Sequence, residues 1–348
     1  MKPVKVVVSG YIGFDNFGDE SILEVLLDNL KQQGCLITVI SSNPQKTALL
    51  HGVKSCKTFS LINILFNLIH TDILISGGGS LLQDKTSLKS LFYYLFIILC
   101  AKLFHKKVII FAQGIGPINN KFAQWLTKFV LKKCDLHSVR DEKSLFLLRG
   151  WGIDAMLQSD PVFNLDIPNY LPQNKLGIQL RSWKHLTTDF LDVLADEIAN
   201  KFPNHEVLIF SFQDTQDYKL CKEFQTKLAL RKPQIKTEII QNNYQHNLIE
   251  NFKNLEYLIA MRFHACLLAI KFGIKTLAIN YDEKVEKLAK ESGIPCINLD
   301  EQDKLDKKIQ EMKTLNESAL LEFAQSQQFN FSKINNLINS VNDPIRHK

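Results

Sequence analysis

The sequence predicts two doubly wound α/β domains with a cleft between them. Short runs rich in β-branched residues alternate with longer helical patterns along most of the chain, and several of these runs end at a glycine. This alternation is typical of parallel sheets that are covered by helices on both faces. The length of 348 residues supports the division, because a domain has roughly 150 residues and each half can then bury its own core.

The first domain is expected over residues 1–165. Its first strand, residues 3–9 (PVKVVVS), ends at Gly10 and is followed by a helical pattern over residues 19–33. A strand at 36–40 comes next, and the pattern is weaker after it. The remaining strands and helices of this half are expected at 72–76, 86–104, 107–112, 120–133 and 135–139, with one more helix after them.

Residues 166–174 (DIPNYLPQN) carry two prolines and no hydrophobic period, which suits a linker. The alternation then restarts, and it predicts a second domain over residues 175–302. Its strands and helices are expected at 176–181, 187–201, 206–211, 216–230, 236–240, 257–261, 263–272 and 275–279. Residues 303–348 are polar and helical in pattern, and we expect this tail to pack back on the domains.

Composition and charge limit the classes of function. The chain is 45% hydrophobic and 22% charged, as in ordinary globular proteins, and its net charge is only +6. No nucleic-acid recognition motif accompanies this weak charge, so no nucleic-acid partner is expected. Seven cysteines, no two closer than 21 residues, predict reduced thiols in a cytoplasmic protein. The start of the chain has the pattern of a strand and not of a secretion signal.

One apolar run raises the question of membrane contact. Residues 91–101 (LFYYLFIILCA) are uninterrupted apolar residues, with Lys89 before them and three lysines within 102–107. A spanning helix needs about 20 residues, so the run is too short to cross a bilayer. The favoured interpretation is a buried helix. The alternative is a helix that docks on the inner surface of a membrane, which would place the contact at residues 89–107.

Glycine-rich segments stand at the ends of three strands of the first domain. They are GYIGFDNFGDE (10–20), SGGGSLLQD (76–84) and AQGIGP (112–117). Their spacing matches neither a dinucleotide fingerprint nor a P-loop. Because ligands of parallel sheets bind beyond the carboxyl ends of the strands, and amides at a helix N-terminus favour anions, we expect a backbone-lined floor for an anionic substrate. Its expected substrate-binding residues are Gly10, Gly13, Asn16, Gly78, Gly79, Ser80, Gln113 and Gly114.

Charged residues follow other strands. Arg140 and Arg181 each stand at a strand end, where a guanidinium can bind a carboxylate or phosphate, and Lys284 opens a helix. His264 lies near the start of a helix in an apolar window, and Asp19 follows the first glycine-rich turn. Each has an ordinary alternative: an ion pair with a neighbouring carboxylate for Arg140, a core histidine for His264, a surface lysine for Lys284 and a helix N-cap for Asp19.

Sequence motifs of hydrolases and zinc enzymes are missing. The chain has no GxSxG, no HExxH and no Cys/His zinc spacing, so neither a nucleophilic hydrolase nor a metal site is expected.

Taken together, eight segments resemble the polysaccharide pyruvyl transferases, especially their cell-surface-anchoring branch. They run in family order up to about residue 295. The segments are GYIGFDNFGDESIL (10–23), DILISGGGSLLQDKTSLKSLFYYL (72–95), AQGIGP (112–117), SVRDEKSLFLL (138–148), SDPVF (159–163), LRSW (180–183), FSFQDTQD (210–217) and MRFHACLLAIKFGIKTLAINYDEKV (261–285). The departures are a GGGS where a fourth glycine is common, Ile12 where an aromatic residue is usual and Glu283 where proline is frequent.

The resemblance implies a glycosyltransferase-B-like fold and transfer of pyruvate from phosphoenolpyruvate to a sugar. The acceptor would be a cell-wall or capsular polysaccharide precursor, such as a lipid-linked secondary cell wall polymer at the inner membrane leaflet. The product would be a cyclic ketal, with phosphoenolpyruvate as donor substrate and no cofactor. A cytoplasmic protein, peripheral on the membrane, is then expected.

By matching motif positions, the resemblance implies that Arg140 and His264 contact phosphoenolpyruvate, and that Asp19 and Lys284 are further functional positions. Ketal formation needs a base for a sugar hydroxyl, a proton for C3 of the donor and stabilisation of negative charge. We expect Asp19 to be the base and His264 the acid or the phosphate ligand, with Lys284 stabilising charge; the reverse assignment of Asp19 and His264 stays open.

Two other functions remain open from the sequence. One is a sugar-nucleotide glycosyltransferase of the same fold, which a ribose-binding carboxylate late in the second domain would favour. No carboxylate there fits this role well, and Glu283 and Glu286 are only weak candidates. The other is a non-catalytic membrane-associated binding protein. The presence of Asp19, Arg140, His264 and Lys284 argues against it.

Overall fold

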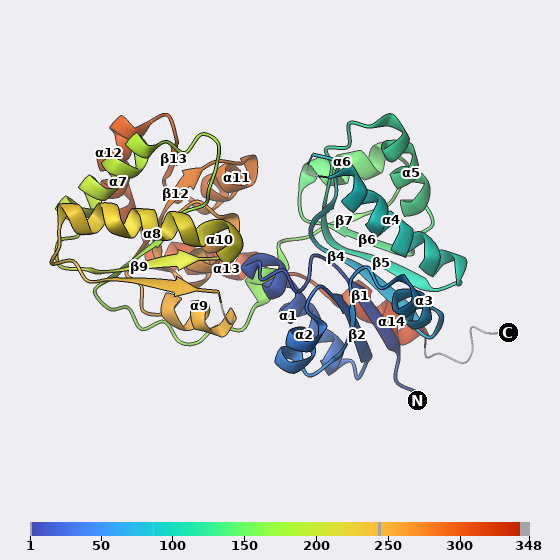
Figure 1. Ribbon diagram of the computed structural model, residues 1–348. Helices are drawn as coiled ribbons and strands as arrows, with labels where there is room; N and C mark the ends of the chain where they lie inside the picture. Colours follow the sequence, from blue (N-terminus) through green and yellow to red (C-terminus); the bar gives the residue numbers. More distant parts are fainter. Residues whose placement is uncertain (1, 86, 243–244, 342–348) are drawn as a thin grey trace. The chain divides into compact units, whose positions relative to one another are not determined.

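Each half of the chain forms one parallel β-sheet in the computed structural model of the protein (Figure 1). The structure describes residues 2–85, 87–242 and 245–341. The contacts between its residues divide the chain into two compact units. Unit 1 contains the chain up to Phe14, then Asp19–Leu165, and the chain from Gln328 onward. Unit 2 contains Asp166–Gln327 together with the short segment Asp15–Gly18.

The sheet of unit 1 has the strand order β3-β2-β1-β4-β5-β6-β7, and every pairing is parallel. The strands are β1 (Lys5–Ser9), β2 (Leu36–Ser41), β3 (Lys54–Lys57), β4 (Ile73–Leu82), β5 (Lys107–Ile115), β6 (Leu136–Val139) and β7 (Met156–Leu157). Central strands are nearly continuous runs of Val and Ile because both of their faces are buried. The order reverses between β1 and β4, and open α/β sheets bind ligands at such a switch point.

Several helices of unit 1 begin at capping residues that the sequence supplies. Asn120 accepts a hydrogen bond from the backbone N–H of Ala123 (2.9 Å), Ser87 from Ser90 (3.2 Å) and Asp141 from Ser144 (2.7 Å). The helices are α1 (Phe17–Gln32), α2 (Pro44–His51), α3 (Leu61–Ile69), α4 (Leu88–Leu103), α5 (Lys121–Leu131), α6 (Glu142–Gly150) and α14 (Ser332–Val341), with a short 3₁₀ helix at Pro161–Asn164.

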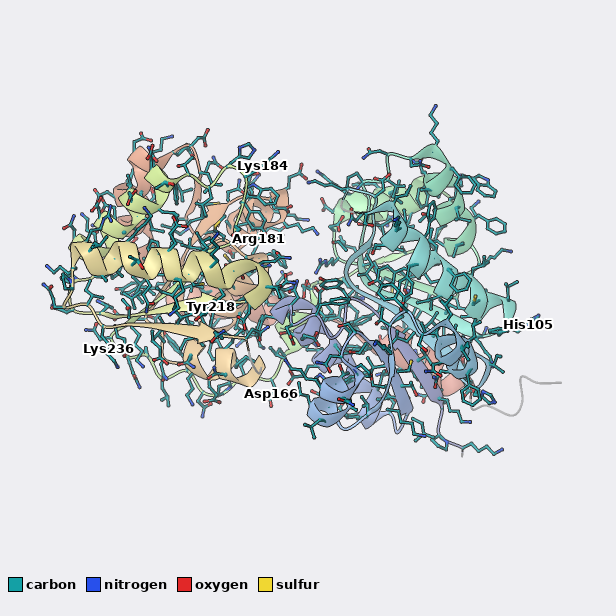
Figure 2. The ribbon with its side chains drawn as sticks, viewed as in Figure 1. His105, Asp166, Arg181, Lys184, Tyr218 and Lys236 are labelled. Atoms are coloured by element: carbon teal, nitrogen blue, oxygen red, sulfur yellow. The ribbon has the colours of Figure 1, made fainter. Side chains whose placement is uncertain are left out.

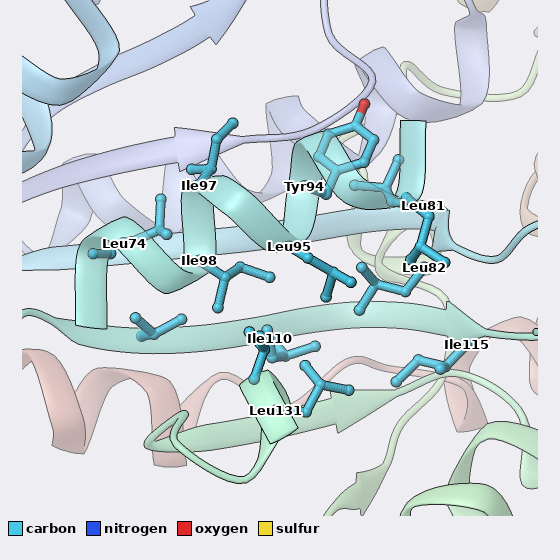
Figure 3. Packing of buried hydrophobic residues seen from close by; sticks show 14 of the residues in the cluster. Leu74, Leu81, Leu82, Tyr94, Leu95, Ile97, Ile98, Ile110, Ile115 and Leu131 are labelled. Atoms are coloured by element: carbon cyan, nitrogen blue, oxygen red, sulfur yellow. The ribbon is translucent and has the colours of Figure 1, made fainter. Parts of the chain in front are cut away.

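Helix α4 lies in the core of unit 1 and contains the apolar run 91–101. Figure 3 shows Leu95 and Ile98 of this helix packed against Leu74 of β4 and Ile110 of β5. Most residues of the run are buried, which confirms the expected buried helix. Phe96, in contrast, is exposed. Within the described part of the chain, no helix combines the length and the apolar character that a transmembrane span requires.

Unit 2 repeats this architecture with the strand order β10-β9-β8-β11-β12-β13, again all parallel. Its strands are β8 (Lys175–Gln179), β9 (Glu206–Ser211), β10 (Thr237–Gln241), β11 (Tyr257–Ala260), β12 (Lys275–Asn280) and β13 (Cys296–Asn298). Its helices are α7 (Thr188–Lys201), α8 (Asp214–Arg231), α9 (Gln245–Phe252), α10 (Phe263–Phe272), α11 (Glu283–Ser292), α12 (Leu305–Lys313) and α13 (Glu317–Ser326), with a 3₁₀ turn at Gln302–Lys304. The predicted pair of doubly wound α/β domains is confirmed.

The C-terminal part of the chain is shared by the two units. Helix α12 buries Leu305, Ile309 and Met312 in the core of unit 2. From Gln328 the chain belongs to unit 1, where the ring of Phe329 lies 5.1 Å from that of Phe111. The segment 303–348, expected as one tail, is therefore divided between the units over its described residues. Residues 166–174 contain no helix or strand.

Candidate functional site

The glycines of SGGGS lie inside strand β4 and not in a turn after it. β4 continues through Leu82 because Gly79 pairs with Gln113 and Leu82 with Ile115 of β5. The triple glycine is thus well separated from α4, which begins at Leu88. The expectation that the strand ends before these glycines is wrong, since the pairing with β5 keeps the chain extended through them. Gln113 and Gly114 likewise lie within β5.

Asp19 lies beside the backbone of Gly79 in unit 1. A Cβ atom at Gly79 would stand 2.6 Å from Oδ1 of Asp19, and the backbone φ of Gly79 is +91°. Only glycine therefore lets this carboxylate approach the strand. Asp19 is in the first turn of α1, two residues after its start at Phe17, so the alternative of an N-cap is wrong. A carboxylate in this turn is stabilised by the helix dipole.

Tyr94 is a second polar group of this region that the sequence did not reveal. It extends from α4, and its side chain is buried in the unit 1 core. Burial, and after it the negative charge of Asp19, raises the pKa of the Tyr94 phenol. The phenol therefore stays protonated and can act as a hydrogen-bond donor near Asp19.

Arg140 directly follows β6, and its guanidinium is held by residues from two other segments. Nη1 donates to Oδ2 of Asp160 (2.6 Å) and Nη2 donates to Oγ of Ser80 (3.3 Å). The ordinary alternative was an ion pair with Asp141 or Glu142. In the structure Asp141 caps α6, and Arg140 forms an ion pair with Asp160, in SDPVF. Both charged side chains are nearly fully buried. The planar fork of the arginine is thereby kept in one orientation, as recognition of a carboxylate or phosphate requires.

Ser80, Gln113 and Gly114 gather around Arg140. A Cβ at Gly114 would lie 2.6 Å from Oγ of Ser80, and the carbonyl of Gln113 accepts a bond from the Arg140 N–H (3.3 Å). The buried Nε2 of Gln113 has no hydrogen-bond partner among the described residues. These three predicted residues and Arg140 form one group at the carboxyl ends of β4, β5 and β6.

Gly10 and Gly13 pack within unit 1 instead. A Cβ at Gly10 would stand 2.9 Å from the carbonyl oxygen of Gly77, and one at Gly13 would stand 2.2 Å from Oγ of Ser41. Both glycines therefore allow backbone segments to pack closely at the ends of β1 and β2. Nothing in these contacts brings them to Arg140.

His264 of unit 2 lies against Gly18, the last residue of the segment Asp15–Gly18. A Cβ at Gly18 would stand only 2.0 Å from Nδ1 of the imidazole. His264 is the second residue of α10 and is half-buried, whereas Ala265 and Cys266 after it are fully buried. His264 is therefore a partly buried residue at the start of α10, with its Nε2 atom buried.

The segment Asp15–Gly18 is fastened to unit 2 by several contacts. The N–H of Phe17 donates to the carbonyl of Phe212 (3.1 Å), and the two rings lie 4.6 Å apart. Nδ2 of Asn242 donates to the carbonyl of Asp15 (2.9 Å). Asn16 accepts a bond from the N–H of Gly18 (3.1 Å), so this predicted binding residue also shapes the turn that reaches His264.

A buried ion pair supports the start of α10, and the sequence did not single it out. Nε and Nη2 of Arg262 donate to the two carboxylate oxygens of Asp217 at 2.8 and 2.7 Å. Asp217, fully buried, also accepts the backbone N–H groups of Phe212 and Gln213, both at 3.1 Å. Gln179 accepts the N–H of Arg262 (2.7 Å). The network thus holds the start of α10 in place at Arg262, two residues before His264.

Arg181 and Lys284 occupy other strand ends of unit 2. Arg181, labelled in Figure 2, donates from Nη1 to the hydroxyl of Tyr281 (3.1 Å) and lies over the rings of Tyr281 and Trp183. Burial raises the pKa of Tyr281, although the charge of Arg181 partly offsets this. Lys284 is half-buried in the first turn of α11, where its N–H bonds to the capping residue Asp282 (3.0 Å).

The cysteines and the possible metal ligands complete the description. All seven cysteines are free thiols. Over the residues that the structure describes, no three His, Cys, Asp or Glu side chains come together in a way that could hold a metal ion.

Solved structures define the class of fold. A crystal structure of a glycosyltransferase from Rickettsia africae superimposes with a TM-score of 0.64 at 12% identity, covering 100% of both chains. A putative UDP-N-acetylglucosamine 2-epimerase from Listeria monocytogenes gives 0.63 at 10% identity, covering 98% of this chain and 96% of the other. HepE of Anabaena, solved with UDP and glucose, gives 0.61 at 10% identity, with 97% and 98% covered. The protein thus has a glycosyltransferase-B-like fold of two Rossmann-like domains.

The sequence identifies the family to which the protein belongs within this class of fold. A model of the polysaccharide pyruvyl transferase family matches residues 16–283, well over half of the chain. The protein therefore belongs to the polysaccharide pyruvyl transferase family and is a transferase. No curated protein sequence matches it. Membership in the cell-surface-anchoring branch stays a prediction.

Proposed function

We propose that the protein transfers pyruvate from phosphoenolpyruvate to a sugar of a cell-wall or capsular polysaccharide precursor, forming a cyclic ketal and releasing phosphate. The observation that carries the proposal is the held guanidinium of Arg140, at the strand ends of unit 1 beside the glycine backbone. Phosphoenolpyruvate offers a carboxylate and a phosphate. A guanidinium has five N–H donors, so the N–H groups that Asp160 and Ser80 do not use can bind either group. Family membership supports the same reaction.

The reaction has two bond-forming steps at C2 of the donor. A sugar hydroxyl loses its proton and its oxygen attacks C2, while C3 gains a proton and becomes a methyl group. Phosphate then leaves C2, a second hydroxyl of the same sugar attacks in its place, and its proton is lost as the ring closes. General acid–base groups typically contribute 10²–10⁴-fold to such proton transfers.

We assign the base to Asp19 and the acid to His264. Asp19 is a carboxylate placed beside Gly79, and the raised pKa of Tyr94 supplies a protonated neighbour that can orient it. His264 is half-buried at the start of α10 on the supported backbone of Arg262. An imidazole can carry the proton for C3 or bind the leaving phosphate. Arg181 and Lys284 would stabilise the remaining negative charge.

The proposal is tested by incubating the protein with phosphoenolpyruvate and lipid-linked sugars. We expect phosphate release together with a mass gain on the sugar equal to one pyruvate less one water. Arg140→Lys keeps the positive charge beside Asp160 but removes the fork, and His264→Ala removes the imidazole, so both should lower the rate at least about 10²-fold. Arg149→Ala, which changes an exposed arginine of α6, serves as the matched control.

The outcomes separate the proposal from its alternatives. Binding of a UDP-sugar with no turnover of phosphoenolpyruvate would identify a sugar-nucleotide glycosyltransferase. Full phosphate release by both variants would show that the assigned residues are not those of the site. The pH dependence of the two single variants Asp19→Asn and His264→Gln distinguishes base from acid, because each should remove one limb of the profile.

A further inference from the structure

The outer sides of three neighbouring helices of unit 1 are apolar. α4 packs against α3 on one side and α5 on the other (Figure 1). On α5, Phe122, Trp125 and Phe129 recur at helical spacing and are 60%, 57% and 42% exposed. The buried side of the same helix consists of Ala123, Thr127, Val130 and Leu131. Aromatic side chains of this size rarely form a row on the free surface of a helix.

Ring contacts join these helices into one surface. Phe122 lies 5.8 Å from Trp125, and Trp125 lies 5.7 Å from Phe129. The ring of Phe92 on α4 lies 6.2 Å from that of Phe122. On the other side of α4, Tyr93 lies 5.1 Å from Phe59, which precedes α3. The exposed apolar residues of this α3–α5 surface are Phe59, Leu61, Ile62, Phe66, Ile69, Phe96, Leu103, Phe122, Trp125 and Phe129.

The same part of the chain carries the positive charge of the protein. Residues 54–135 contain eleven lysines, three aspartates and neither arginine nor glutamate, a net charge of +8. The whole chain carries +6, so all other residues together carry −2. Two of the aspartates, Asp72 and Asp84, accept backbone N–H bonds, and the third, Asp135, pairs with Lys102 and Lys107.

Lysines stand beside the aromatic row of α5. At 100° per residue, Lys121, Lys128 and the C-cap Lys132 lie on one flank of the row, and Lys133 follows in the turn after the helix. Nζ of Lys133 is 4.7 Å from the centre of the Phe129 ring. Aromatic residues flanked by lysines are the composition of a helix that lies in a membrane interface.

We propose that the α3–α5 surface docks on an anionic phospholipid bilayer. Its rings enter the boundary between head groups and acyl chains, and its lysines bind the lipid phosphates, each contributing on the order of 1 kcal/mol at a negative surface. A second copy of this chain is disfavoured as the partner, because it would bring the same +8 segment against the first. The proposal goes beyond the proposed function and does not depend on it.

The surface differs from the contact that the apolar run suggested. The alternative interpretation of the sequence places membrane contact at residues 89–107, but most of the apolar side chains of α4 are buried in the core. α4 contributes mainly Phe96 and Leu103, and the remaining exposed rings and aliphatic groups come from α3, α5 and Phe59.

Vesicle flotation with the full chain tests the proposal. We expect the protein to float with vesicles of equal parts phosphatidylglycerol and phosphatidylcholine, to remain in solution with phosphatidylcholine alone, and to bind less at high salt. Trp125 is the most exposed of the three tryptophans, so its fluorescence should shift to the blue on binding.

Matched variants distinguish binding through this surface from nonspecific binding to vesicles. Trp125→Ala combined with Phe129→Ala should weaken vesicle binding at least about tenfold. Leu230→Ala removes a side chain that is 78% exposed on α8 of unit 2 and should leave binding unchanged. Lys128→Glu with Lys132→Glu should abolish binding, whereas Lys222→Glu on α8 should lower it only slightly. An unchanged far-ultraviolet circular dichroism spectrum and an unchanged melting temperature show that each variant is folded.

Three results would overturn the proposal. They are no flotation with the anionic vesicles at low salt, wild-type flotation of the Trp125 and Phe129 double variant, and a dimer in light scattering that this double variant abolishes. The last result would assign the surface to a second copy of the chain.

Discussion

Replacing Gly18 by alanine separates the role of His264 from the stability of helix α1. Gly18 has an ordinary helical backbone in the first turn of α1, so alanine should favour the helix by about 0.5–1 kcal/mol. The new Cβ, however, would stand 2.0 Å from Nδ1 of His264, and ordinary contact begins at 3.4 Å. The imidazole must therefore move by about 1.4 Å. A displacement of 1 Å in a catalytic group costs on the order of 10²-fold in rate.

Gly18→Ala should consequently lower phosphate release from phosphoenolpyruvate by about 10²-fold or more while the melting temperature stays unchanged or rises. The matched control is Gly150→Ala, at the end of α6, where a Cβ would meet nothing within 4 Å. It should leave the rate unchanged. If the effect acts through the imidazole, adding Gly18→Ala to His264→Ala should cause no further loss. Wild-type turnover by Gly18→Ala would refute the assignment of His264 to catalysis.

Three further substitutions test buried groups that stabilise the two units. Asp217→Asn breaks the buried pair with Arg262 and should destabilise the protein by about 3–5 kcal/mol, seen as a lower melting temperature. Ile98→Ala should cost about 2–5 kcal/mol in urea unfolding, because the side chain is fully buried; a cost near zero would contradict the buried α4. Burial lowers the pKa of His137 below its ordinary 6.5, so the unfolded chain binds its proton first and the free energy of unfolding falls as pH drops through this range. Wild-type protein should lose more stability between about pH 7.5 and about pH 5.5 than His137→Gln, and equal losses would contradict a buried neutral imidazole.

The sequence pattern predicted the strands of both cores because their residues face buried helices on both sides. It failed where a strand lacks this signature. β3 has the sequence KSCK and lies at the edge of its sheet, so no hydrophobic run marks it. β4 was expected to end at residue 76, since glycines have low strand propensity, but its pairing with β5 carries it to Leu82. Only the tertiary pairing decides such a case.

Candidate residues were recognisable where their type is unusual for their position, as with Arg140 and His264. Their partners were not. Asp160 is separated from Arg140 by 20 residues, and Asp217 from Arg262 by 45. A buried carboxylate has no local signal, because its role depends on which cation the fold brings to it. Both partners lie in segments that carry the family resemblance, and a search of those segments for unpaired acids and cations would have suggested them.

The first glycine-rich motif is dense in special residues because its parts serve different units. Gly10 and Gly13 let the ends of β1 and β2 pack closely in unit 1. Residues 15–18 then belong to unit 2, where Asn16 forms the turn and Gly18 lies against His264. Asp19, the next residue, is again in unit 1, beside Gly79. Each position has its own steric reason to be small or polar, so no single loop motif, such as a P-loop, describes the segment. Gly18 and Asp19 are neighbours in the chain, yet the contacts of Gly18 with His264 belong to unit 2 and those of Asp19 with Gly79 belong to unit 1.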